Sequence, residues 1–417
     1  ALTGAPWLGM SVAEISQLKR ILIIGSNLRK DHPLIAARIR KAVKRGAELA
    51  LLNPHDDDFA LPVARKAIVA PSMMVEALER SVSALENKDS PADDSARAIA
   101  THLSGAKPAA IVLGNLAHHH PQFSRLHELA HKAAQLAGAK FGFFGEAANS
   151  VGGYLAQATP FASSPRGMNA MEMLAKPRRA YLLLGVEPEL DCHDPRQATT
   201  AMRQAELVVA LSAYRHRASD YAHVMLPIAP FTETAGTFVN CEGRAQSFKA
   251  AVPPLGETRP GWKVLRVLGN TLKLSGFDYD TVEAIRAEIA VNGVPLNNAA
   301  TYSLRSSPFP ETAGIKRIAE VPIYSADAIV RRSPPLQKTR DANDPIATMR
   351  GSLMRKLGLD EGSMVRLRQN GGEAVVAVRQ DDRLPDNCVR IAAGHPLTSA
   401  LGPMFGKISV ERIQSGK

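Results

Sequence analysis

Five histidines fall within residues 118–131, HHHPQFSRLHELAH, and residues 127–131 match the pattern H-E-x-x-H. On a helix this spacing places two imidazoles on one face, where they can bind zinc while the glutamate acts as a general base. A zinc hydrolase built on His127, Glu128 and His131 is therefore one chemistry that these residue types allow.

The surroundings of this motif argue against zinc hydrolysis. The following sequence lacks the glycine and third histidine of one class of zinc proteases, and Glu146 follows a predicted strand instead of lying on a second helix. At about 100° per residue, the apolar stripe of the predicted helix leaves His131 and Glu128 on the solvated side and His127 near the border. That stripe consists of Phe123, Leu126, Ala130, Ala133 and Ala137. We expect solvated histidines and no metal site.

The three cysteines, Cys192, Cys241 and Cys388, lie far apart in the chain. No CxxC pattern is present, so the chain by itself cannot ligate an iron–sulfur cluster, and the low count fits a reducing compartment. Cys192, His193 and Asp194 have the residue types of a nucleophilic cluster. Adjacent side chains point in different directions, however, whereas a catalytic pair must converge. We therefore expect no catalytic residue in this chain.

The charge balance is basic. The 417 residues include 51 Lys and Arg against 40 Asp and Glu, a formal net charge of +11. Such a chain can bind nucleic acid, anionic lipid or an acidic protein. No cluster of Lys and Arg is interleaved with aromatic residues, so we expect a protein partner and no nucleic acid. No apolar run reaches the roughly 18 residues of a membrane helix, so we expect no membrane insertion.

The first ten residues, ALTGAPWLGM, contain neither an initiator Met nor a basic segment followed by a long apolar core. They do not have the pattern of a signal peptide. We expect the chain to be part of a longer protein or a processed product.

Segments that alternate between strand and helix patterns must position any site. ILII is typical of a buried strand, GSN of a tight turn, HPLIAARIRKAVKRG of a helix with apolar positions 34, 35, 39 and 43, and ELALLN of the next strand. The pattern recurs along 108–146 and 178–214, and a further strand is expected within 222–230. This alternation predicts doubly wound α/β domains with parallel sheets. Glycine turns follow three of the strands, at Gly25, Gly114 and Gly185.

Composition divides the chain into four parts. We expect a first Rossmann-like α/β domain at 1–155, a second α/β domain at 156–293, a linker at 294–345 and a small C-terminal β-barrel domain at 346–417. The linker prediction rests on a stretch rich in Pro, Ser, Asn and Arg with little periodicity. The barrel prediction rests on a helix pattern at 349–362, followed by strand patterns around an Asn-Gly-Gly hairpin.

Several segments resemble the molybdopterin-oxidoreductase superfamily. ILIIGSNLRKDHPLIAARIRKAVKRGAEL is similar to its G-S-N-P turn and proline-led helix. The block at 218–270, with ETAGTFVNCEGR followed by GETRPGW, resembles its most specific motif. LGLDEGSMVRLRQNGGEAVVAVRQDDRLPDNCVRIAAG resembles its C-terminal double-psi barrel, which binds pterin dinucleotide. EAANSVGGYLA, at 146–156, resembles the large peripheral-arm subunit (75 kDa type) of NADH:quinone oxidoreductase, respiratory complex I.

The resemblance marks ten positions as vestiges of a cofactor-binding site: Gly25, Ser26, Asn27, Gly185, Glu233, Gly236, Thr237, Asn240, Gly243 and Arg244. At the first turn, backbone amides could face a phosphate at the mouth of the sheet, and the later glycines permit close backbone approach. Glu233 and Arg244 could pair with each other or contact a polar ligand. We expect these residues to form turns and brace loops.

Three departures from the family pattern predict that the cofactor has been lost. Leu28 replaces the proline of the first turn, and Asn53-Pro54-His55 replaces V-D-P-R, whose Asp accepts hydrogen bonds from guanine. Glu187 replaces the Asn of the second turn and would repel a pyrophosphate. We expect no cofactor, and in particular no molybdopterin, in this segment.

The resemblance implies a component of the peripheral arm of complex I. We interpret the chain as a cofactor-free molybdopterin-like scaffold, with electron transfer from NADH to quinone carried by 2Fe-2S and 4Fe-4S clusters outside this segment. The implied partners are the other peripheral-arm subunits and the N-terminal iron–sulfur part of the same subunit, on the cytoplasmic side of the bacterial inner membrane. One alternative is a fragment of a functional molybdopterin-dinucleotide oxidoreductase similar to formate dehydrogenase or nitrate reductase. The zinc hydrolase is the third hypothesis.

Overall fold

A five-stranded parallel sheet forms the first part of the molecule. The computed structural model describes residues 4–87, 93–160, 167–291, 294–299 and 313–413. The strand order is β3-β2-β1-β4-β5. The strands are β1 (Arg20–Ile24), β2 (Glu48–Asn53), β3 (Arg65–Ile68), β4 (Ala109–Leu113) and β5 (Lys140–Phe143). The order reverses between β1 and β4, which makes this a doubly wound sheet with a crevice at the carboxyl ends of those strands.

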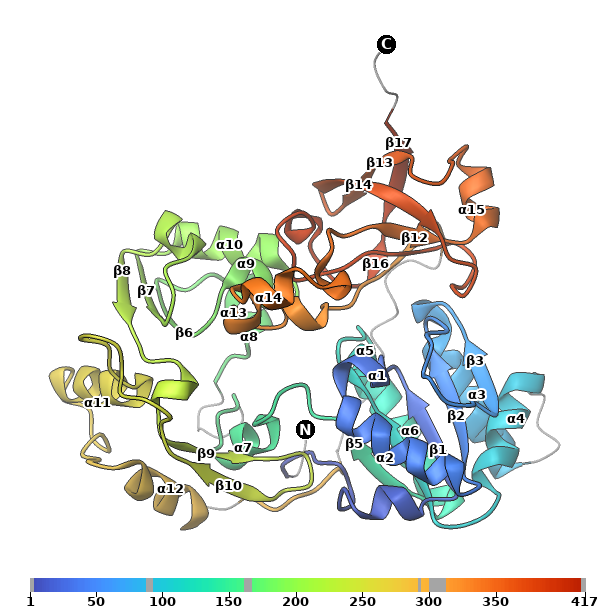
Figure 1. The fold of residues 1–417 in the computed structure, drawn as a ribbon, viewed down its shortest axis with the longest axis horizontal. Coiled ribbons are helices and arrows are strands. Elements are labelled where there is room, and N and C mark those ends of the chain that lie inside the picture. Colours follow the sequence, from blue (N-terminus) through green and yellow to red (C-terminus); the bar gives the residue numbers. More distant parts are fainter. Residues whose placement is uncertain (1–3, 88–92, 161–166, 292–293, 300–312, 414–417) are drawn as a thin grey trace.

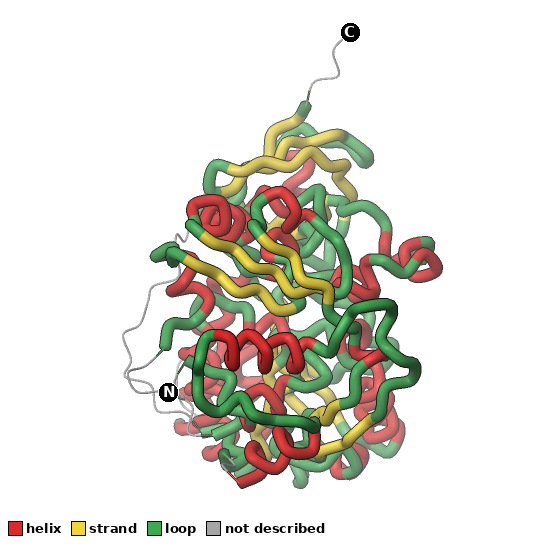
Figure 2. The backbone as a smooth tube through the Cα atoms, turned by 90° about the vertical axis from the view of Figure 1, so that its left-hand side faces the viewer, coloured by secondary structure: helices red, strands yellow, loops and turns green. Residues whose placement is uncertain are grey.

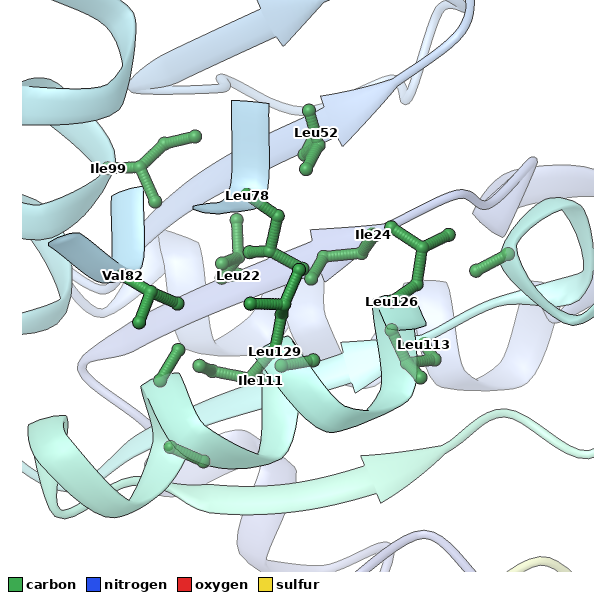
Figure 3. Packing of buried hydrophobic residues seen from close by; sticks show 14 of the residues in the cluster. Leu22, Ile24, Leu52, Leu78, Val82, Ile99, Ile111, Leu113, Leu126 and Leu129 are labelled. Atoms are coloured by element: carbon green, nitrogen blue, oxygen red, sulfur yellow. The ribbon is translucent and has the colours of Figure 1, made fainter. Parts of the chain in front are cut away.

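Helices cover both faces of this sheet, as the blue and cyan elements of Figure 1 show. They are α1 (Leu28–Asp31), α2 (Pro33–Lys44), α3 (Met74–Glu86), α4 (Asp94–Leu103), α5 (Asn115–His118) and α6 (Phe123–Ala137). The helix α7 (Ser150–Leu155) follows β5 and lies beside the later hairpin at 236–248. Each face of the sheet has its own hydrophobic core. Successive residues of β1 belong to different cores, because side chains of a strand point alternately to opposite faces. Leu22 and Ile24 pack with Leu78 of α3 and Leu126 of α6 (Figure 3), whereas Ile23 packs with residues of α2.

The buried face of α2 agrees with the predicted one except at Leu34. Leu34, expected in the apolar stripe, is 82% exposed. The residues of α2 that are buried are Ile35, Ala36, Ile39 and Ala42. At about 100° per residue these four cluster on one side, and Leu34 lies about 130° from their centre. The predicted positions Ile35 and Ile39 are confirmed, and Val43 packs partly buried against the same core, so the prediction is wrong at Leu34.

A three-stranded parallel sheet forms the second part, in the order β6-β7-β8. Its strands are β6 (Ala180–Leu184), β7 (Leu207–Ser212) and β8 (Val224–Pro227), accompanied by α8 (Ala170–Ala175), α9 (Pro188–Asp191) and α10 (Pro195–Gln204). The predicted helix at 195–204 is confirmed as α10. Tyr181 and Val208 pack with Ala201 and Met202 of α10, so this helix covers one face.

The opposite face of this second sheet is apolar and exposed. Leu182 and Leu184 are both 47% exposed, and Val224 is 43% exposed. Leu182, Val209 and Val224 are paired across the three strands and form a continuous row. In Figure 2 the strands of this sheet lie in front, with no helix covering them in that view. Parallel sheets in α/β proteins normally have both faces covered.

An antiparallel hairpin and two helices follow the second sheet. They are β9 (Gly236–Val239), β10 (Ala245–Phe248), α11 (Gly261–Thr271) and α12 (Val282–Val291). β9 pairs with β10, and the hairpin that they form carries most of the predicted site residues of the block at 218–270.

A seven-stranded, barrel-like sheet forms the third part, in the order β16-β11-β15-β12-β14-β13-β17. Its strands are β11 (Lys316–Ile318), β12 (Ala347–Met349), β13 (Met364–Gln369), β14 (Gly372–Gln380), β15 (Cys388–Arg390), β16 (Gly406–Lys407) and β17 (Ser409–Arg412). The helix α15 (Gly351–Lys356) accompanies it, whereas α13 (Ala328–Arg331) and α14 (Pro334–Gln337) lie beside α9 of the second part. The predicted hairpin is confirmed as β13–β14. The helix predicted at 349–362 is shorter, because residues 347–349 are buried in β12.

The predicted linker is wrong at residues 316–318, which form β11 inside this sheet. Arg317 is only 1% exposed, and its guanidinium donates to Gln369 Oε1 (2.9 Å) and to the carbonyl oxygens of Gly402 (3.1 Å) and Pro403 (2.9 Å). A basic stretch suggested a solvated surface, but the barrel supplies the acceptors that allow Arg317 to be buried. The other domain boundaries stay predictions. No helix within the described part of the chain is long and apolar enough to span a membrane.

Candidate functional site

The first glycine turn joins β1 to α1 at the crevice. Gly25 has a φ of +63°, and a Cβ there would lie 2.5 Å from the backbone nitrogen of Ala117, so only glycine fits. The amide of Gly25 donates to Leu52 O (2.9 Å), and the amide of Ser26 donates to Asn53 Oδ1 (2.8 Å). Two of the amides that could face a phosphate are thus satisfied within the protein.

Asn53, at the end of β2, holds this turn in place. Its Nδ2 donates to the carbonyl oxygens of Ser26 (3.1 Å) and His55 (3.0 Å), while its Oδ1 accepts from the Ser26 amide. Asn53 is fully buried, so each of these bonds replaces water that the side chain has lost. The sequence identified Asn53 only as a weakened acceptor for guanine. Its bracing role was missed because it depends on the β1–β2 pairing.

A largely buried charged cluster lies beside the turn, between the first sheet and the barrel. Arg390 of β15 donates to Asp57 (3.2 and 3.4 Å) and pairs with Glu320, which also accepts from Asn27 Nδ2. His55 lies between the two carboxylates, and both of its ring nitrogens lack a hydrogen bond to any described residue. Burial, followed by the nearby Arg390, lowers the pKa of His55 to about 4. This cluster joins residues far apart in sequence, and sequence reasoning did not find it.

The cluster borders a polar cavity of about 460 Å³. Burial, then the charge of Glu320, raises the pKa of Asp31 in its wall to about 7. Further residues that line the cavity include Asp58, Asp341, Asp344, Arg340, Arg379 and Arg383. Of the ten predicted site residues, only Asn27 is among those that line this cavity. The wall of the cavity thus combines carboxylates with basic side chains.

The second glycine turn joins β6 to α9 and is also satisfied internally. Gly185 has a φ of +63°, and its amide donates to Leu211 O (2.8 Å). Glu187 is 4% exposed and accepts two hydrogen bonds from Arg332 (2.7 and 3.2 Å), with Arg331 at 3.7 Å. The carboxylate thereby engages guanidinium groups that a phosphate would otherwise attract.

The predicted residues at 233–244 brace the β9–β10 hairpin. Glu233 accepts from the amide of Leu255 (2.9 Å), and Thr237 bonds Ser247 across the hairpin (2.9 Å). In the turn, Asn240 Oδ1 accepts from the amide of Arg244 (2.9 Å).

Two glycines of this hairpin allow close packing and a left-handed turn, and Arg244 pairs with a neighbour in the same turn. Gly236 packs against Phe248, and Gly243 has a φ of +84°. Arg244 pairs with Glu242 (3.2 Å) and Glu233 accepts from the Leu255 amide, so within the described residues each of the two has another partner.

The side chains of the histidine-rich segment have separate partners and do not converge on one site. His119 pairs with Glu146, whereas the buried His120 contacts Pro71 O through Nε2 (2.8 Å). His127 was predicted at the border of the helix, but it is fully buried and its Nε2 contacts Asn298 O at 2.7 Å. The prediction was wrong because Phe141 of β5 stacks on that ring and Phe143 meets it edge-on, which extends the core.

The other residues of the H-E-x-x-H motif are also engaged. Glu128 pairs with Arg125 at 2.8 Å, and His131 is half-buried with its ring 5.3 Å from that of Phe141. Among the described residues, two groups place three possible metal-ligating atoms within 4.8 Å of one another: His55, Asp57 and Glu320, and Glu187, Glu189 and His216. The H-E-x-x-H residues do not form such a group. Arg390 and Arg332 already neutralise carboxylates of the two groups.

The Cys192-His193-Asp194 cluster does not have the features of a nucleophilic site. Burial, then the charge of Asp191, raises the pKa of the Cys192 thiol to about 11, so the thiol stays protonated at neutral pH. The Asp194 side chain accepts from the amide of Gln197 (3.1 Å) and caps α10. These residues therefore start a helix.

Comparison with known proteins identifies the family to which this architecture belongs. A family model described as molybdopterin oxidoreductase matches residues 1–271, which include both glycine turns and the β9–β10 hairpin. The chain belongs to the molybdopterin oxidoreductase family. This molybdopterin oxidoreductase chain has the fold of acetylene hydratase from Pelobacter acetylenicus, with a TM-score of 0.66 and 14% identity over 97% of this chain and 81% of that chain.

Curated relatives of this molybdopterin oxidoreductase chain include respiratory subunits. It is 25% identical over 276 residues to the mitochondrial NADH-ubiquinone oxidoreductase 78 kDa subunit of Candida albicans, covering 66% of this chain and 34% of that protein. It is 26% identical over 225 residues to a subunit of NADH-quinone oxidoreductase from Mycobacterium bovis, covering 53% of this chain and 27% of that protein. The chain thus spans about a third or less of the length of these relatives.

The residues of both turns do not fit the pyrophosphate of a molybdopterin dinucleotide. At the first turn, the amides of Gly25 and Ser26 are bonded internally, and Glu320 faces the cavity. At the second turn, Glu187 replaces the neutral residue and holds Arg332. A phosphate at either turn would displace internal hydrogen bonds and approach a carboxylate, which is unfavourable on both counts.

Proposed function

We propose that this chain is the molybdopterin-oxidoreductase-like part of the large peripheral-arm subunit of an NADH:quinone oxidoreductase. It serves there as a cofactor-free scaffold on the cytoplasmic side of a bacterial inner membrane. It packs against the iron–sulfur part of the same subunit and against other peripheral-arm subunits. Electrons pass through clusters outside this segment, and no residue of the segment is catalytic.

One observation carries the scaffold proposal: at both glycine turns the protein's own side chains occupy the groups that would bind a pyrophosphate. Asn53 binds the first turn, and Glu187 binds the guanidinium groups beside the second. Side chains that satisfy a former ligand site from within stabilise the fold without a cofactor.

The exposed face of the second sheet supports the assembly role. The row of Leu182, Val209 and Val224 leaves an apolar strip in contact with solvent. Contiguous apolar surface of this kind typically marks a protein–protein contact. We propose that a neighbouring subunit covers this face in the assembled enzyme.

Analysis of bound metal and pterin tests the scaffold proposal. The whole enzyme is purified, molybdenum and tungsten are measured by mass spectrometry, and pterin is detected by fluorescence after oxidative release. We expect iron and neither of the other metals, with no pterin fluorescence. Molybdenum or tungsten in stoichiometric amount, together with pterin, would instead establish the functional molybdopterin-dinucleotide oxidoreductase, for which the 460 Å³ cavity would be the binding space.

The substitution Leu182→Asp tests the assembly role. A charge in a buried subunit contact is strongly unfavourable, so we expect the fraction of assembled enzyme on native gels to fall at least tenfold. Leu34→Asp is the matched control, because Leu34 is even more exposed but lies on α2 of the first sheet. Equal assembly of both variants, with unchanged melting of the isolated chain, would contradict a contact at the second sheet.

A further inference from the structure

His55, Asp57 and Glu320 meet at the junction between the first sheet and the barrel. His55 and Asp57 follow β2, whereas Glu320 follows β11. Each residue offers one nitrogen or oxygen atom, and the three atoms lie within 4.8 Å of one another. The fold thus brings one imidazole and two carboxylates together from two distant parts of the sequence.

The imidazole of His55 has no hydrogen bond on either side. The residue is 1% exposed, and neither Nδ1 nor Nε2 has a hydrogen-bond partner among the described residues. The carboxylate oxygens that face the ring are Asp57 Oδ2, 3.7 Å from Nδ1, and Glu320 Oε2, 3.9 Å from Nε2. Both distances are longer than a hydrogen bond. A buried nitrogen without a partner is unfavourable, so this arrangement lacks a group between the ring and the carboxylates.

The two gaps beside the imidazole suit a metal ion better than a water molecule. A water that bridged two such atoms would hold them about 4.6 Å apart. Zinc binds nitrogen and carboxylate oxygen at about 2.0–2.2 Å, so two of its tetrahedral ligands lie about 3.4 Å apart. The distances of 3.7 and 3.9 Å are closer to the zinc spacing. Because such an ion lies between the side chains, the imidazole itself does not have to be open to the cavity.

Arg390 occupies one edge of each carboxylate and leaves the other edge towards His55. Its guanidinium donates to Asp57 Oδ1 (3.2 Å) and pairs with Glu320 Oε1. The oxygens that face His55 are the other two, Oδ2 and Oε2. Oδ2 is 3.4 Å from the guanidinium, and Oε2 accepts a hydrogen bond from Asn27. Each carboxylate can therefore bind a second cation while it keeps its contact with Arg390.

The charge of the cluster also favours a second cation. Asp57 and Glu320 carry two negative charges, and Arg390 supplies one positive charge. Arg383 also attracts Asp57, but it is itself paired with Asp381 (2.8 Å). Both Asp57 and Glu320 line the 460 Å³ cavity, which gives an ion a path from solvent to the cluster.

We propose that His55, Asp57 and Glu320 bind one zinc ion through one imidazole nitrogen and one oxygen of each carboxylate. Imidazole and carboxylate are both ordinary zinc ligands, and three protein ligands leave a fourth position for water from the cavity. The three residues meet only in the folded chain, so zinc stabilises the native state and holds the barrel against the first sheet. This site does not depend on the scaffold role proposed above.

Zinc titration of the full chain tests the site. The chain is treated with EDTA and dialysed, and isothermal titration calorimetry with zinc chloride then gives the stoichiometry and the Kd. We expect one zinc ion per chain and a melting temperature that rises with zinc concentration. His55→Phe keeps a buried ring but removes the ligand. Its Kd should rise about a hundredfold or more, since losing even a group that supports a zinc ligand costs about 10- to 100-fold.

Two matched controls remove histidines that belong to other candidate metal sites. His131→Phe alters the H-E-x-x-H motif, and His216→Phe alters the second group of possible ligands. Both variants should bind zinc as the unaltered chain does. If either control loses zinc while His55→Phe keeps it, the chain holds an adventitious ion only, and the proposal is overturned.

X-ray absorption at the zinc edge of the unaltered chain keeps the test independent of whether His55→Phe folds. We expect one imidazole nitrogen and otherwise oxygen ligands, at about 2.0–2.2 Å. Two imidazoles or a sulfur ligand would place the ion elsewhere and overturn the proposal. It is equally overturned if the unaltered chain binds no zinc, or if a folded His55→Phe chain binds zinc with an unchanged Kd.

Discussion

At the scale of single residues, the site is defined by side chains that bond to their own protein. Asn53 ends β2 and Glu187 lies in the turn after β6, at the edge of the sheets where related folds present groups to a ligand. In this chain each makes at least two hydrogen bonds to neighbouring residues. Changes at these positions should therefore affect stability more than any binding activity.

Asn53→Asp restores the residue type of the family pattern and should destabilise the protein. The carboxylate cannot donate to the carbonyls of Ser26 and His55, so two bonds become repulsive contacts between buried oxygens. We expect a loss of roughly 2–4 kcal/mol in the free energy of unfolding, measured with urea. Asn270→Asp, on the exposed side of α11, is the control and should change stability by less than about 0.5 kcal/mol. A similar small change for Asn53→Asp would contradict the bracing role.

Asp31 should make stability depend on pH. Its folded-state pKa is raised from 3.8 to about 7, so between these values the native state binds a proton that the unfolded state has released. Stability therefore falls as pH rises from about 4 to about 7 and changes little above. Asp31→Asn removes this loss and should raise stability at pH 8 by about 2–4 kcal/mol, with no gain at pH 3.

Thermal melts of Asp31→Asn across this pH range test the prediction. Asp58→Asn is the control, because its side chain is 64% exposed in a surface pair with Arg29. Such pairs contribute little, about 0–1 kcal/mol. A constant difference between Asp31→Asn and the unaltered protein from pH 3 to pH 8 would refute a raised pKa at Asp31.

At the scale of elements, local pattern predicted strands and helices well where burial is regular. The helix at 195–204 was found from its periodicity, and the strands β1, β2 and β4 were found as short apolar runs because both of their faces are buried. For α2 the pattern placed Ile35 and Ile39 correctly in the core and failed at Leu34, because an apolar residue type does not by itself show that a side chain is buried.

Paired substitutions on α2 test its orientation. Ile39→Ala removes buried side-chain volume and should cost about 2–4 kcal/mol. Leu34→Ala removes a side chain that is 82% exposed and should change stability by less than about 0.5 kcal/mol. Urea unfolding of both variants measures the difference. Equal costs would place Leu34 in a core.

At the scale of the whole molecule, Arg390 connects the barrel to the first sheet. It pairs with Asp57, which follows β2, and with Glu320, which follows β11. Arg390→Met should leave both carboxylates without a counter-charge in a largely buried place and lower stability by about 3–5 kcal/mol. Differential scanning calorimetry would show the lost coupling as an earlier transition of the barrel.

A second contact between the same parts of the molecule serves as the control. Lys30 pairs with Asp341 at 2.7 Å, but both side chains are about 40% exposed. Lys30→Met should therefore cost less than about 1 kcal/mol. If Lys30→Met separates the transitions as strongly as Arg390→Met, the coupling does not depend on the buried cluster.

The sequence by itself determined the alternating α/β architecture, the glycine turns and the family, because these depend on local periodicity and on short motifs. It also indicated where the cofactor pattern is broken, at Asn53 and Glu187. It could not give their partners, because Arg332 lies 145 residues from Glu187.

Only the tertiary structure decided the environment of each candidate residue. Residues 316–318 were predicted to lie in a linker, but they form β11. Arg317 of this strand can be buried because Gln369, Gly402 and Pro403 accept hydrogen bonds from its guanidinium. His127 was predicted near solvent, and it is buried because β5 places two phenylalanines against it. Burial and charge pairing are sums over contacts that are distant in sequence, so they are fixed when the sheets and the barrel come together.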